Sequence, residues 1–499
     1  MENKKYKPFS HWFLLVLFTV AFALIILLVP QVHAYSPTRE SNAENDEKYR
    51  YLDVINSVYN YLLNNYVDEI DPRILYEGAL EGMLNAVEDP YTTYMDAVQV
   101  RSLTDTTDGN FGGVGLSITK SAESTPEKPA YVEVVSPIEG TPGWKAGIQT
   151  GDLILTIDEV ATPDITMDEV LDILRGAEGS SVDLTLRRGN TDFSVTLIRD
   201  IIEVPTVKYG MITENGQNTG YMRIIQFTPQ TPERVQEALD SFISENFDSL
   251  IIDLRNNPGG LIDSVADVAD KFIDSGVIVS TKSRLMFENT VFRASKKNTT
   301  MPSDIPIAVL INRGAASASE ILAGALKDYH LAYLVGERTF GKGSVQQVQG
   351  LPYNDGFKIT MARYYTPSDS NIDKIGIPPD TEVLYAELSE EESDLYIEII
   401  TSDVISDYVH ENPGMNEAAI AAYARELAAT YNLEESLLRR LIRMEVFPDA
   451  LYDLDFDVQL IKALEIVHDP NFYESVKNAK TLSELQVIAA EEDESLKSN

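Results

Sequence analysis

Residues 249–260 read Ser-Leu-Ile-Ile-Asp-Leu-Arg-Asn-Asn-Pro-Gly-Gly, and this stretch decides the fold of the middle of the chain. Its first half is an almost continuous apolar run, which is typical of a strand buried on both faces of a parallel sheet. A glycine-rich turn and a helical pattern over 261–272 follow. Residues 305–312 and 333–336 give two further buried runs with a helical stretch between them. This alternation predicts an α/β unit whose parallel strands are joined by right-handed crossovers.

Ser317 stands in the turn after the second of these strands. Residues 312–320 read Asn-Arg-Gly-Ala-Ala-Ser-Ala-Ser-Glu and lead into a helix. Parallel sheets place their sites at the carboxyl ends of the strands, so this serine is a candidate nucleophile. A serine hydroxyl is a poor nucleophile at neutral pH unless a base removes its proton. The alternative is that Ser317 serves only as the N-cap of the helix, a position that serine often occupies.

A lysine and a glutamine further along the chain favour the catalytic alternative. Residues 339–346 read Thr-Phe-Gly-Lys-Gly-Ser-Val-Gln, which places Lys342 and Gln346 four residues apart. A lysine that burial keeps neutral can accept the proton of a serine. Gln346 is a neutral hydrogen-bond partner, so it orients the amine without stabilising its charged form. We therefore expect Ser317 as nucleophile, Lys342 as base and Gln346 as the residue that orients the base.

The histidines do not offer another base. Two of the five lie in the first 34 residues, and two lie in a polar, helical C-terminal region. The fifth, His330, follows Ser317 along the same helix and should lie roughly 20 Å away at about 1.5 Å per residue. A Ser-His-Asp triad is therefore hard to assemble. The trypsin-like proteases with PDZ domains need such a histidine and are not favoured.

Acyl transfer also needs hydrogen-bond donors for the oxyanion. Ala318 begins the helix, and its N–H can supply one donor. Gly259 and Gly260 follow the neighbouring strand and carry no side chain that would block the approach of the backbone, so one of their N–H groups is the expected second donor. The Gly-x-x-x-x-Gly-Lys-Ser/Thr pattern of a P-loop does not occur. We expect neither a metal nor a cofactor.

The composition excludes several classes of protein. The chain has 499 residues, 44% of them hydrophobic, which is enough for two to four domains with their own cores. It has 40 basic and 79 acidic residues and a net charge of −39, so nucleic acid is not an expected partner. It has no cysteine, which excludes disulfides, thiolate metal sites and a cysteine nucleophile.

The first 34 residues have the layout of a targeting segment. Basic residues precede an apolar run over 12–29, and Val-His-Ala at 32–34 has the small residue of a cleavage site. The run is long for a secretory signal and almost long enough to span a bilayer. Residues 1–34 are therefore either a cleaved signal peptide or an uncleaved signal anchor. In both cases we expect the rest of the chain outside the cytoplasm, either secreted or anchored to the cell membrane.

Helical spacing dominates both ends of the remaining chain. Over 35–97, apolar residues recur at helical spacing from 47 to 66 and again from 74 to 86, before a turn at 88–94. The first helix is either an oligomerisation arm, which implies a homodimer, or an ordinary packed helix. Residues 386–499 begin with an acidic stretch and continue as amphipathic helices. For them we expect a role in packing or dimerisation.

Residues 98–199 resemble a PDZ domain. Phe-Gly-Gly-Val-Gly-Leu-Ser-Ile at 111–118 leads into a strand, Ala-Gly-Ile-Gln-Thr-Gly-Asp follows at 146–152, and a helix over 166–174 precedes a further strand. In PDZ domains a glycine-bearing loop presents N–H groups to the C-terminal carboxylate of a peptide, which adds a strand beside the helix. Arg175 at the end of that helix either meets the carboxylate or is a solvated helix-end arginine. By resemblance the carboxylate loop consists of Gly113, Val114, Gly115 and Leu116.

Five motifs together resemble the carboxyl-terminal processing (tail-specific) serine proteases. The family implies a ClpP/crotonase-like α/β protease core, here over 200–385, whose catalytic residues map onto Ser317, Lys342 and Gln346. One departure is Ala315, where the family usually has a serine that is not the nucleophile. The motifs, in the order of the family and within about 89–380, are 253–260, Ser-Ala-Ser-Glu at 317–320, 339–346, Tyr-Thr-Pro at 365–367 and Gly-Ile-Pro-Pro-Asp at 376–380.

The predicted molecule is therefore an α+β multidomain protein with a protease core, a PDZ domain and helical N- and C-terminal appendages. The resemblance implies a serine endopeptidase that acts on proteins or peptides with exposed C-termini, with the PDZ domain reading the tails and gating the site. The alternative is a non-catalytic binding or scaffold protein on the same fold.

Overall fold

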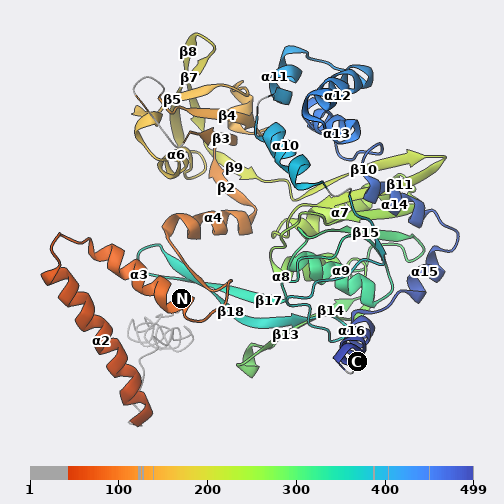
Figure 1. The fold of residues 1–499 in the computed structure, drawn as a ribbon, viewed down its shortest axis with the longest axis horizontal. Helices are drawn as coiled ribbons and strands as arrows, with labels where there is room; N and C mark the ends of the chain where they lie inside the picture. Colours follow the sequence, from red (N-terminus) through yellow and green to blue (C-terminus); the bar gives the residue numbers. More distant parts are fainter. Residues whose placement is uncertain are drawn as a thin grey trace, which may run out of the picture. The chain divides into compact units, whose positions relative to one another are not determined.

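The computed structural model describes residues 43–497 except 122–124, 126–128, 139, 386–387, 403 and 449 (Figure 1). The predicted signal segment, 1–34, lies outside the described residues. Within the described part, no helix combines the length and the apolar character that a membrane span requires.

Two helices form where the apolar spacing predicts them near the N-terminus, α2 (Ala43–Asn65) and α3 (Pro72–Asn85). No side chain described in either helix is buried. Several large apolar side chains of α2 are exposed, among them Tyr51 at 61%, Val54 at 61% and Tyr61 at 69%. These helices thus bury no core of their own.

The predicted parallel sheet is confirmed. Strands β11, β12, β15 and β16 are parallel neighbours, so the strand that opens the deciding stretch lies in the middle of the sheet and all its residues are buried. An antiparallel strand, β10, and a short parallel strand, β19, complete the two edges. The strands in sheet order are β10 (Val207–Glu214), β11 (Gln217–Ile224), β12 (Ser249–Asp253), β15 (Ile307–Ile311), β16 (Tyr333–Gly336) and β19 (Thr381–Glu382).

Helices cover both faces of this sheet. Helices α7 (Thr231–Ser244), α8 (Ile262–Ala269) and α9 (Ala318–Asp328) bury their apolar faces in one core cluster. Helices α14 (Val458–Val467) and α15 (Phe472–Asn478) fill a second cluster against alternate side chains of the same strands. Such two-sided burial explains why the central strands are apolar throughout rather than alternating.

A second layer, made of antiparallel strands, lies beside the parallel sheet (Figure 1). Its first strand, β1 (Thr93–Met95), comes from the predicted N-terminal helical region and pairs with β18, with Thr93 opposite Lys358. Residues 93–95, from the predicted N-terminal helical region, thus lie in the same sheet as β18. The other strands are β13 (Ser275–Ser283), β14 (Val291–Ser295), β17 (Ser344–Gly350) and β18 (Gly356–Tyr365), with a short helix, η2 (Met286–Glu288), between β13 and β14.

The PDZ-like unit has its own sheet and its own core. The first strand of that sheet lies at its edge, next to β4 alone. A helix, α4 (Ala97–Asp108), precedes the unit, and a two-stranded ribbon of β2 (Asn110–Gly113) and β9 (Asp200–Glu203) closes it. Its elements are β3 (Leu116–Lys120), β4 (Val132–Pro137), α5 (Pro142–Lys145), β5 (Leu153–Ile157), β6 (Val160–Ala161), η1 (Thr162–Asp164), α6 (Met167–Leu174), β7 (Ser181–Arg188) and β8 (Thr191–Ile198).

The C-terminal region, predicted as one helical appendage over 386–499, has two parts in the structure. Its first four helices share a separate apolar cluster. Its last three pack on the protease core: α14 and α15 as above, and α16 (Leu482–Lys497) through Leu482. The four helices of the separate cluster are α10 (Glu390–Thr401), α11 (Val404–Glu411), α12 (Glu417–Tyr431) and α13 (Glu435–Val446).

Candidate active site

Ser317 immediately precedes α9 in an unusual backbone conformation. Its φ is +55° and its ψ is −113°. A non-glycine residue with positive φ is strained, and such strain collects at functional sites. The Glu320 N–H donates to the Ser317 carbonyl oxygen at 2.9 Å, and Ser317 and Glu320 form a capping box at the start of α9. Ser317 thus occupies the N-cap position of α9, and its side chain is only half-buried.

The buried carboxylate of Glu320 joins the two predicted catalytic loops. Its Oε2 accepts hydrogen bonds from the N–H groups of Ser317 at 2.9 Å and Lys342 at 2.8 Å. Its Oε1 accepts from Thr339 Oγ1 at 2.5 Å and from the Gly341 N–H at 2.8 Å. Burial raises the pKa of Glu320, although these four hydrogen bonds act to lower it. One side chain thus fixes the backbone of both loops.

A buried phenol makes a second connection between the same loops. The Tyr364 hydroxyl, on β18, lies 3.1 Å from the Ser317 carbonyl oxygen and also within hydrogen-bond distance of the Lys342 carbonyl oxygen. The backbone N–H of Tyr364 donates to the Gly343 carbonyl oxygen at 3.0 Å. Burial raises the pKa of this phenol well above its ordinary value, so it remains a donor.

The Lys342 amine lies in an environment that favours its neutral form. Burial lowers the pKa of Lys342, and the charge of Lys358 lowers it further, against the opposing effect of Glu320. The Lys342 Nζ lies 5.3 Å from the centre of the Tyr91 ring. Among the described residues, no hydrogen bond joins this Nζ to Ser317 Oγ or to Gln346. The amine is thus available to a group that enters the site.

Gln346 lies on β17, the strand that follows the lysine loop. Its Nε2 is buried and has no hydrogen-bond acceptor among the described residues. A buried amide N–H without an acceptor costs roughly 1–3 kcal/mol, and such exceptions usually have a functional reason.

Gly259, one of the residues predicted to form the oxyanion hole, lies next to the serine. A Cβ added to Gly259 would lie 2.8 Å from Ser317 Cβ and 2.9 Å from the Ala318 nitrogen, so only glycine allows this approach. The Gly259 N–H donates to Asn257 Oδ1 at 2.8 Å. The N–H groups of Gly260 and Ala318 donate to no described residue. Of the two glycines, Gly260 therefore has the N–H that is free for a ligand.

The predicted carboxylate loop of the PDZ-like unit is held by its carbonyl groups. The Val114 carbonyl accepts from the Gly143 N–H at 2.8 Å, and the Gly115 carbonyl accepts from the Ile138 N–H at 2.9 Å. The N–H groups of Val114 and Gly115 have no acceptor among the described residues. Gly113 ends β2, and Leu116 begins the edge strand β3. The Arg175 guanidinium lies 5.2 Å from the centre of the Phe111 ring.

Three residues around the site were missed by the sequence analysis. Glu320 belongs to the motif at 317–320 but has no predicted role. Tyr364 precedes the motif at 365–367, and Tyr91 lies in the turn at 88–94. The only sequence signal for Glu320 was an acidic residue in the first turn of a helix that is otherwise apolar. No local signal marks Tyr364 and Tyr91, because their positions depend on the pairing of β18 and β1 with distant strands.

Comparisons with known proteins identify the family. Family models match over residues 218–383 (peptidase family S41), 22–98 (activating protease CtpB N-terminal domain) and 133–188 (PDZ domain). The carboxy-terminal-processing protease of Bartonella bacilliformis is 37% identical over 371 residues, which cover 73% of this chain and 81% of that protein. The carboxy-terminal processing protease CtpA of Bacillus subtilis is 34% identical over 372 residues, which cover 74% and 76%.

Among solved structures, the photosystem II D1 C-terminal processing protease matches with 30% identity and a TM-score of 0.40, over 68% of this chain and 93% of that one. Both processing proteases are more than 30% identical to this chain, and the chain covers more than two thirds of each. This similarity is enough to assign the family. The chain belongs to peptidase family S41 and is a PDZ-containing serine-type peptidase of the carboxyl-terminal processing proteases.

Proposed function

We propose that this protein is an endopeptidase that uses Ser317, Lys342 and Gln346 to cleave proteins after recognising their C-terminal tails. The observation that carries the proposal is the pair of connections, through Glu320 and Tyr364, that hold the serine loop and the lysine loop together. On this view the protease core has the ClpP/crotonase-like arrangement that the sequence motifs imply.

In the proposed reaction, the neutral Lys342 amine takes the proton of Ser317 as Oγ attacks the scissile carbonyl carbon. The N–H groups of Gly260 and Ala318 stabilise the oxyanion that forms. The Lys342 ammonium then gives its proton to the leaving amine, which leaves an acyl group on Ser317. A water molecule, deprotonated by the same lysine, releases the acyl group as a carboxylate and restores the serine hydroxyl.

Gln346 has a simple role in this scheme. An ammonium has three donors and no acceptor, whereas a neutral amine has a lone pair. The neutral amine also keeps two N–H groups, which can donate to the side-chain oxygen of Gln346 while the lone pair faces Ser317. A hydrogen bond of this kind would orient Lys342 and leave its lone pair free to take the Ser317 proton.

The PDZ domain supplies tail recognition in this proposal. The free N–H groups of Val114 and Gly115 would bind the carboxylate of the tail, and the tail would add as a strand to β3, which lies at a sheet edge. Because the first 34 residues have the pattern of a targeting segment, we place the substrates outside the cytoplasm. The exposed apolar side chains of α2 support a homodimer in which a second copy covers them.

Cleavage of an unfolded protein by purified full-length variants tests the catalytic part. Ser317→Ala should reduce kcat by at least about a thousandfold, because the nucleophile is lost. Ser303→Ala, at an exposed serine before β15, is the matched control and should keep full activity. A Ser317→Ala variant as active as the wild type would refute the proposal.

A further inference from the structure

A cavity of about 450 Å³ lies between the protease core and the C-terminal helices, away from the predicted catalytic residues. Its size is within the range of roughly 300–1,000 Å³ that small-molecule sites occupy. Strands β11 and β12 line one side through Tyr221, Arg223 and Asp253, and the end of α13 lines another through Arg440 and Met444.

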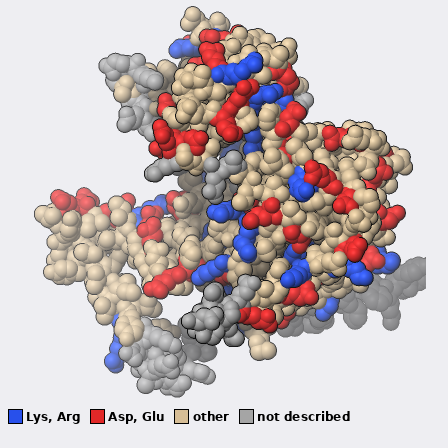
Figure 2. Space-filling model, turned by 45° about the vertical axis from the view of Figure 1, so that its right-hand side comes forward, with Lys and Arg blue, Asp and Glu red and all other residues tan. Residues whose placement is uncertain are grey.

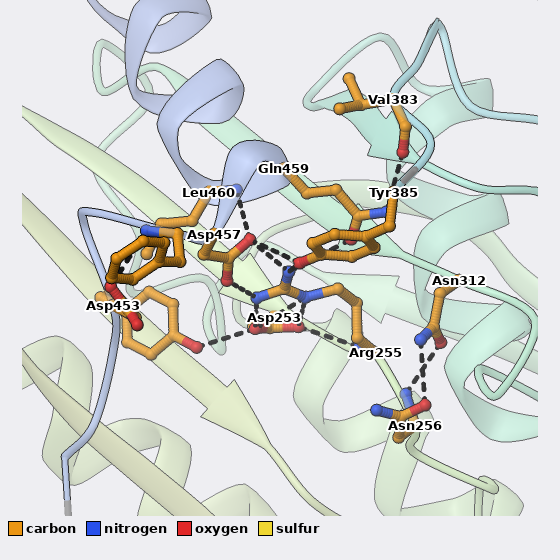
Figure 3. A network of polar contacts seen from close by, with 12 residues as sticks. Asp253, Arg255, Asn256, Asn312, Val383, Tyr385, Asp453, Asp457, Gln459 and Leu460 are labelled. Carbon is orange, nitrogen blue, oxygen red and sulfur yellow. Dashed lines mark hydrogen bonds and ion pairs between the residues drawn. The ribbon is translucent and has the colours of Figure 1, made fainter. Parts of the chain in front are cut away.

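One arginine in the wall of the cavity is fully paired within the protein. Arg255 donates to both oxygens of Asp253 and both oxygens of Asp457, and to Gln459 Oε1 at 3.1 Å (Figure 3). Tyr385 donates to Asp457 Oδ1 at 3.0 Å beside it. This network needs no further partner and gives the cavity a rigid polar floor.

Two other arginines of the wall have no acidic partner among the described residues. The Nε of Arg223 is buried without a hydrogen-bond acceptor, and its guanidinium forms no ion pair with any described residue. The Arg440 guanidinium lies 4.7 Å from the centre of the Tyr385 ring and forms no ion pair within the described part either. Both residues are half-buried, and leaving such cations unpaired is costly. The lining also contains Arg443, which pairs with Asp453 at 3.5 Å, and Glu337, which accepts from Gln459 Nε2 at 3.3 Å.

The rim of the same cavity is apolar. Met444 and Phe447 line it and remain 60% and 42% exposed, and Pro448 and Leu451 continue the surface. A free anion such as phosphate would gain nothing from contact with these apolar side chains. A carboxylate that carries an apolar group would bury them, which is favourable.

We propose that this cavity binds a carboxylate attached to an apolar group, with Arg223 and Arg440 holding the carboxylate and Met444 and Phe447 covering the apolar part. The C-terminal residue of a peptide and a free apolar carboxylic acid share this chemistry. The site is separate from the PDZ loop, and its occupancy does not depend on the proposed catalytic mechanism.

The cavity lies beside the loop that carries Ser317 and the loop that carries Gly259 and Gly260. Asn256 and Asn312 line it and hydrogen-bond to each other, through Asn312 Nδ2 to Asn256 Oδ1 at 2.9 Å and through the Asn256 N–H to Asn312 Oδ1 at 2.9 Å. Asn256 lies three residues before Gly259, and Asn312 lies five before Ser317. A ligand in the cavity therefore touches the start of the loop that carries the nucleophile and the loop that carries the oxyanion glycines.

Equilibrium binding to the full-length Ser317→Ala chain tests the proposal, because this variant cannot process a peptide probe. The probes are acetyl-leucine and acetyl-Ala-Ala-Leu, each compared with its C-terminal amide and with inorganic phosphate. Arg223→Gln and Arg440→Gln should each weaken carboxylate binding about tenfold or more at one class of site, as the loss of a charged hydrogen bond implies. Arg425→Gln, at an exposed arginine of α12 outside the cavity, is the matched control and should bind like the parent.

The outcomes separate this site from the PDZ loop. Binding of both free acids that depends on Arg223 and Arg440 supports the proposal with a peptide tail as ligand. If only the binding of acetyl-leucine depends on the two arginines, the ligand of the site is a free carboxylic acid and not the C-terminus of a peptide. The proposal would be overturned if neither substitution changed the affinity for the acids. It would also be overturned if the amides or phosphate bound as tightly as the acids.

The stability of the unliganded variants gives an independent readout. Arg223→Gln should unfold at the same temperature as the parent or higher, because it removes a cation that has no partner. A clear fall in its unfolding temperature would show that Arg223 is a structural residue and would contradict the proposal. Arg223→Lys keeps the charge and should retain part of the affinity.

Discussion

At the scale of single residues, the centre of the site is a carboxylate that takes no part in the proposed chemistry. Glu320 accepts four hydrogen bonds, two of them from the N–H groups of Ser317 and Lys342. Because its oxygens face only donors, a neutral amide in the same place would turn its NH₂ group toward at least one of them. The relative position of nucleophile and base therefore depends on one carboxyl side chain.

Glu320→Gln should lower kcat/KM about a hundredfold, the order of loss that a displacement of about 1 Å produces. It should also lower the free energy of unfolding by about 1–3 kcal/mol, since a buried donor loses its acceptor. Steady-state kinetics and urea denaturation measure the two effects, with Glu411→Gln, an exposed residue, as the charge control. Full activity in Glu320→Gln would show that the two loops do not need this connection.

The protonation of Lys342 makes a prediction for pH. The base must be neutral, so kcat/KM should rise with pH through the pKa of Lys342, which burial and the charge of Lys358 hold below its ordinary value. Lys358→Gln removes that charge, which raises the pKa of Lys342, moves the acid limb to higher pH and lowers activity at neutral pH. Lys297→Gln, at an exposed lysine, should leave the profile in place. An acid limb that does not move in Lys358→Gln would contradict lysine as the base.

At the scale of elements, the strands and helices that alternate around 249–336 could be predicted because their apolar runs depend only on local sequence. Strands β12, β15 and β16 and helices α8 and α9 form where the pattern predicts them. Ala315, where the sequence departs from the family motif, is buried, and its backbone carbonyl accepts from the Phe340 N–H at 3.0 Å. This contact uses only the backbone, so it does not depend on a serine side chain at position 315.

The parts that the sequence missed depend on contacts between distant segments. Tyr91 approaches Lys342 only because β1 pairs with β18, and no pattern around residue 91 announces that pairing. The division of the C-terminal region was missed for a related reason. Amphipathic spacing shows that a helix has an apolar face, but it does not show whether that face meets other helices, as in α12, or a sheet, as in α14.

Helix α14 is fixed to the sheet by a polar contact at its start. Asp457 caps the helix through the Leu460 N–H at 3.0 Å and pairs with Arg255, and the two side chains are only 13% and 12% exposed. Burial alone would raise the pKa of Asp457, but the hydrogen bond and charge of Arg255 hold it below its ordinary value. The ionised carboxylate thus stabilises the fold above its unfolded pKa, and this stabilisation is lost as the pH falls through the lowered folded value.

Asp457→Asn should therefore lower the free energy of unfolding at pH 7 by about 3 kcal/mol, the order expected when a buried pair loses one charge. The difference from the wild type should shrink on acidification below about pH 4, where the wild-type carboxylate also becomes neutral. Urea denaturation at several pH values measures this, with Asp304→Asn at an exposed position as the control. A difference that is constant with pH would show that packing, and not charge, fixes α14.

At the scale of the whole molecule, charge and domain order suit a protease that receives protein chains. Acidic side chains are spread over the face in Figure 2, with basic side chains scattered among them, so this face has no basic stripe for a nucleic acid. In the sequence, the PDZ domain lies between β1 and the strands of the parallel sheet. The chain enters the domain through β2 and leaves it through β9, and these two strands pair with each other. A tail bound on β3 would thus be held by a domain that the core flanks in sequence on both sides.

Tail recognition by this domain predicts that the free C-terminal carboxylate of a substrate matters at a distance from the cleaved bond. Amidation of the C-terminus of an unfolded substrate should lower kcat/KM about tenfold or more, because the N–H groups of Val114 and Gly115 lose a charged acceptor. Acetylation of the substrate N-terminus is the matched change and should have no effect. The carboxylate preference should persist in Arg223→Gln, which separates the PDZ loop from the cavity described above. Equal cleavage of amidated and free tails would mean that the PDZ domain binds internal segments or another partner, and the loop with free N–H groups would then need a different ligand.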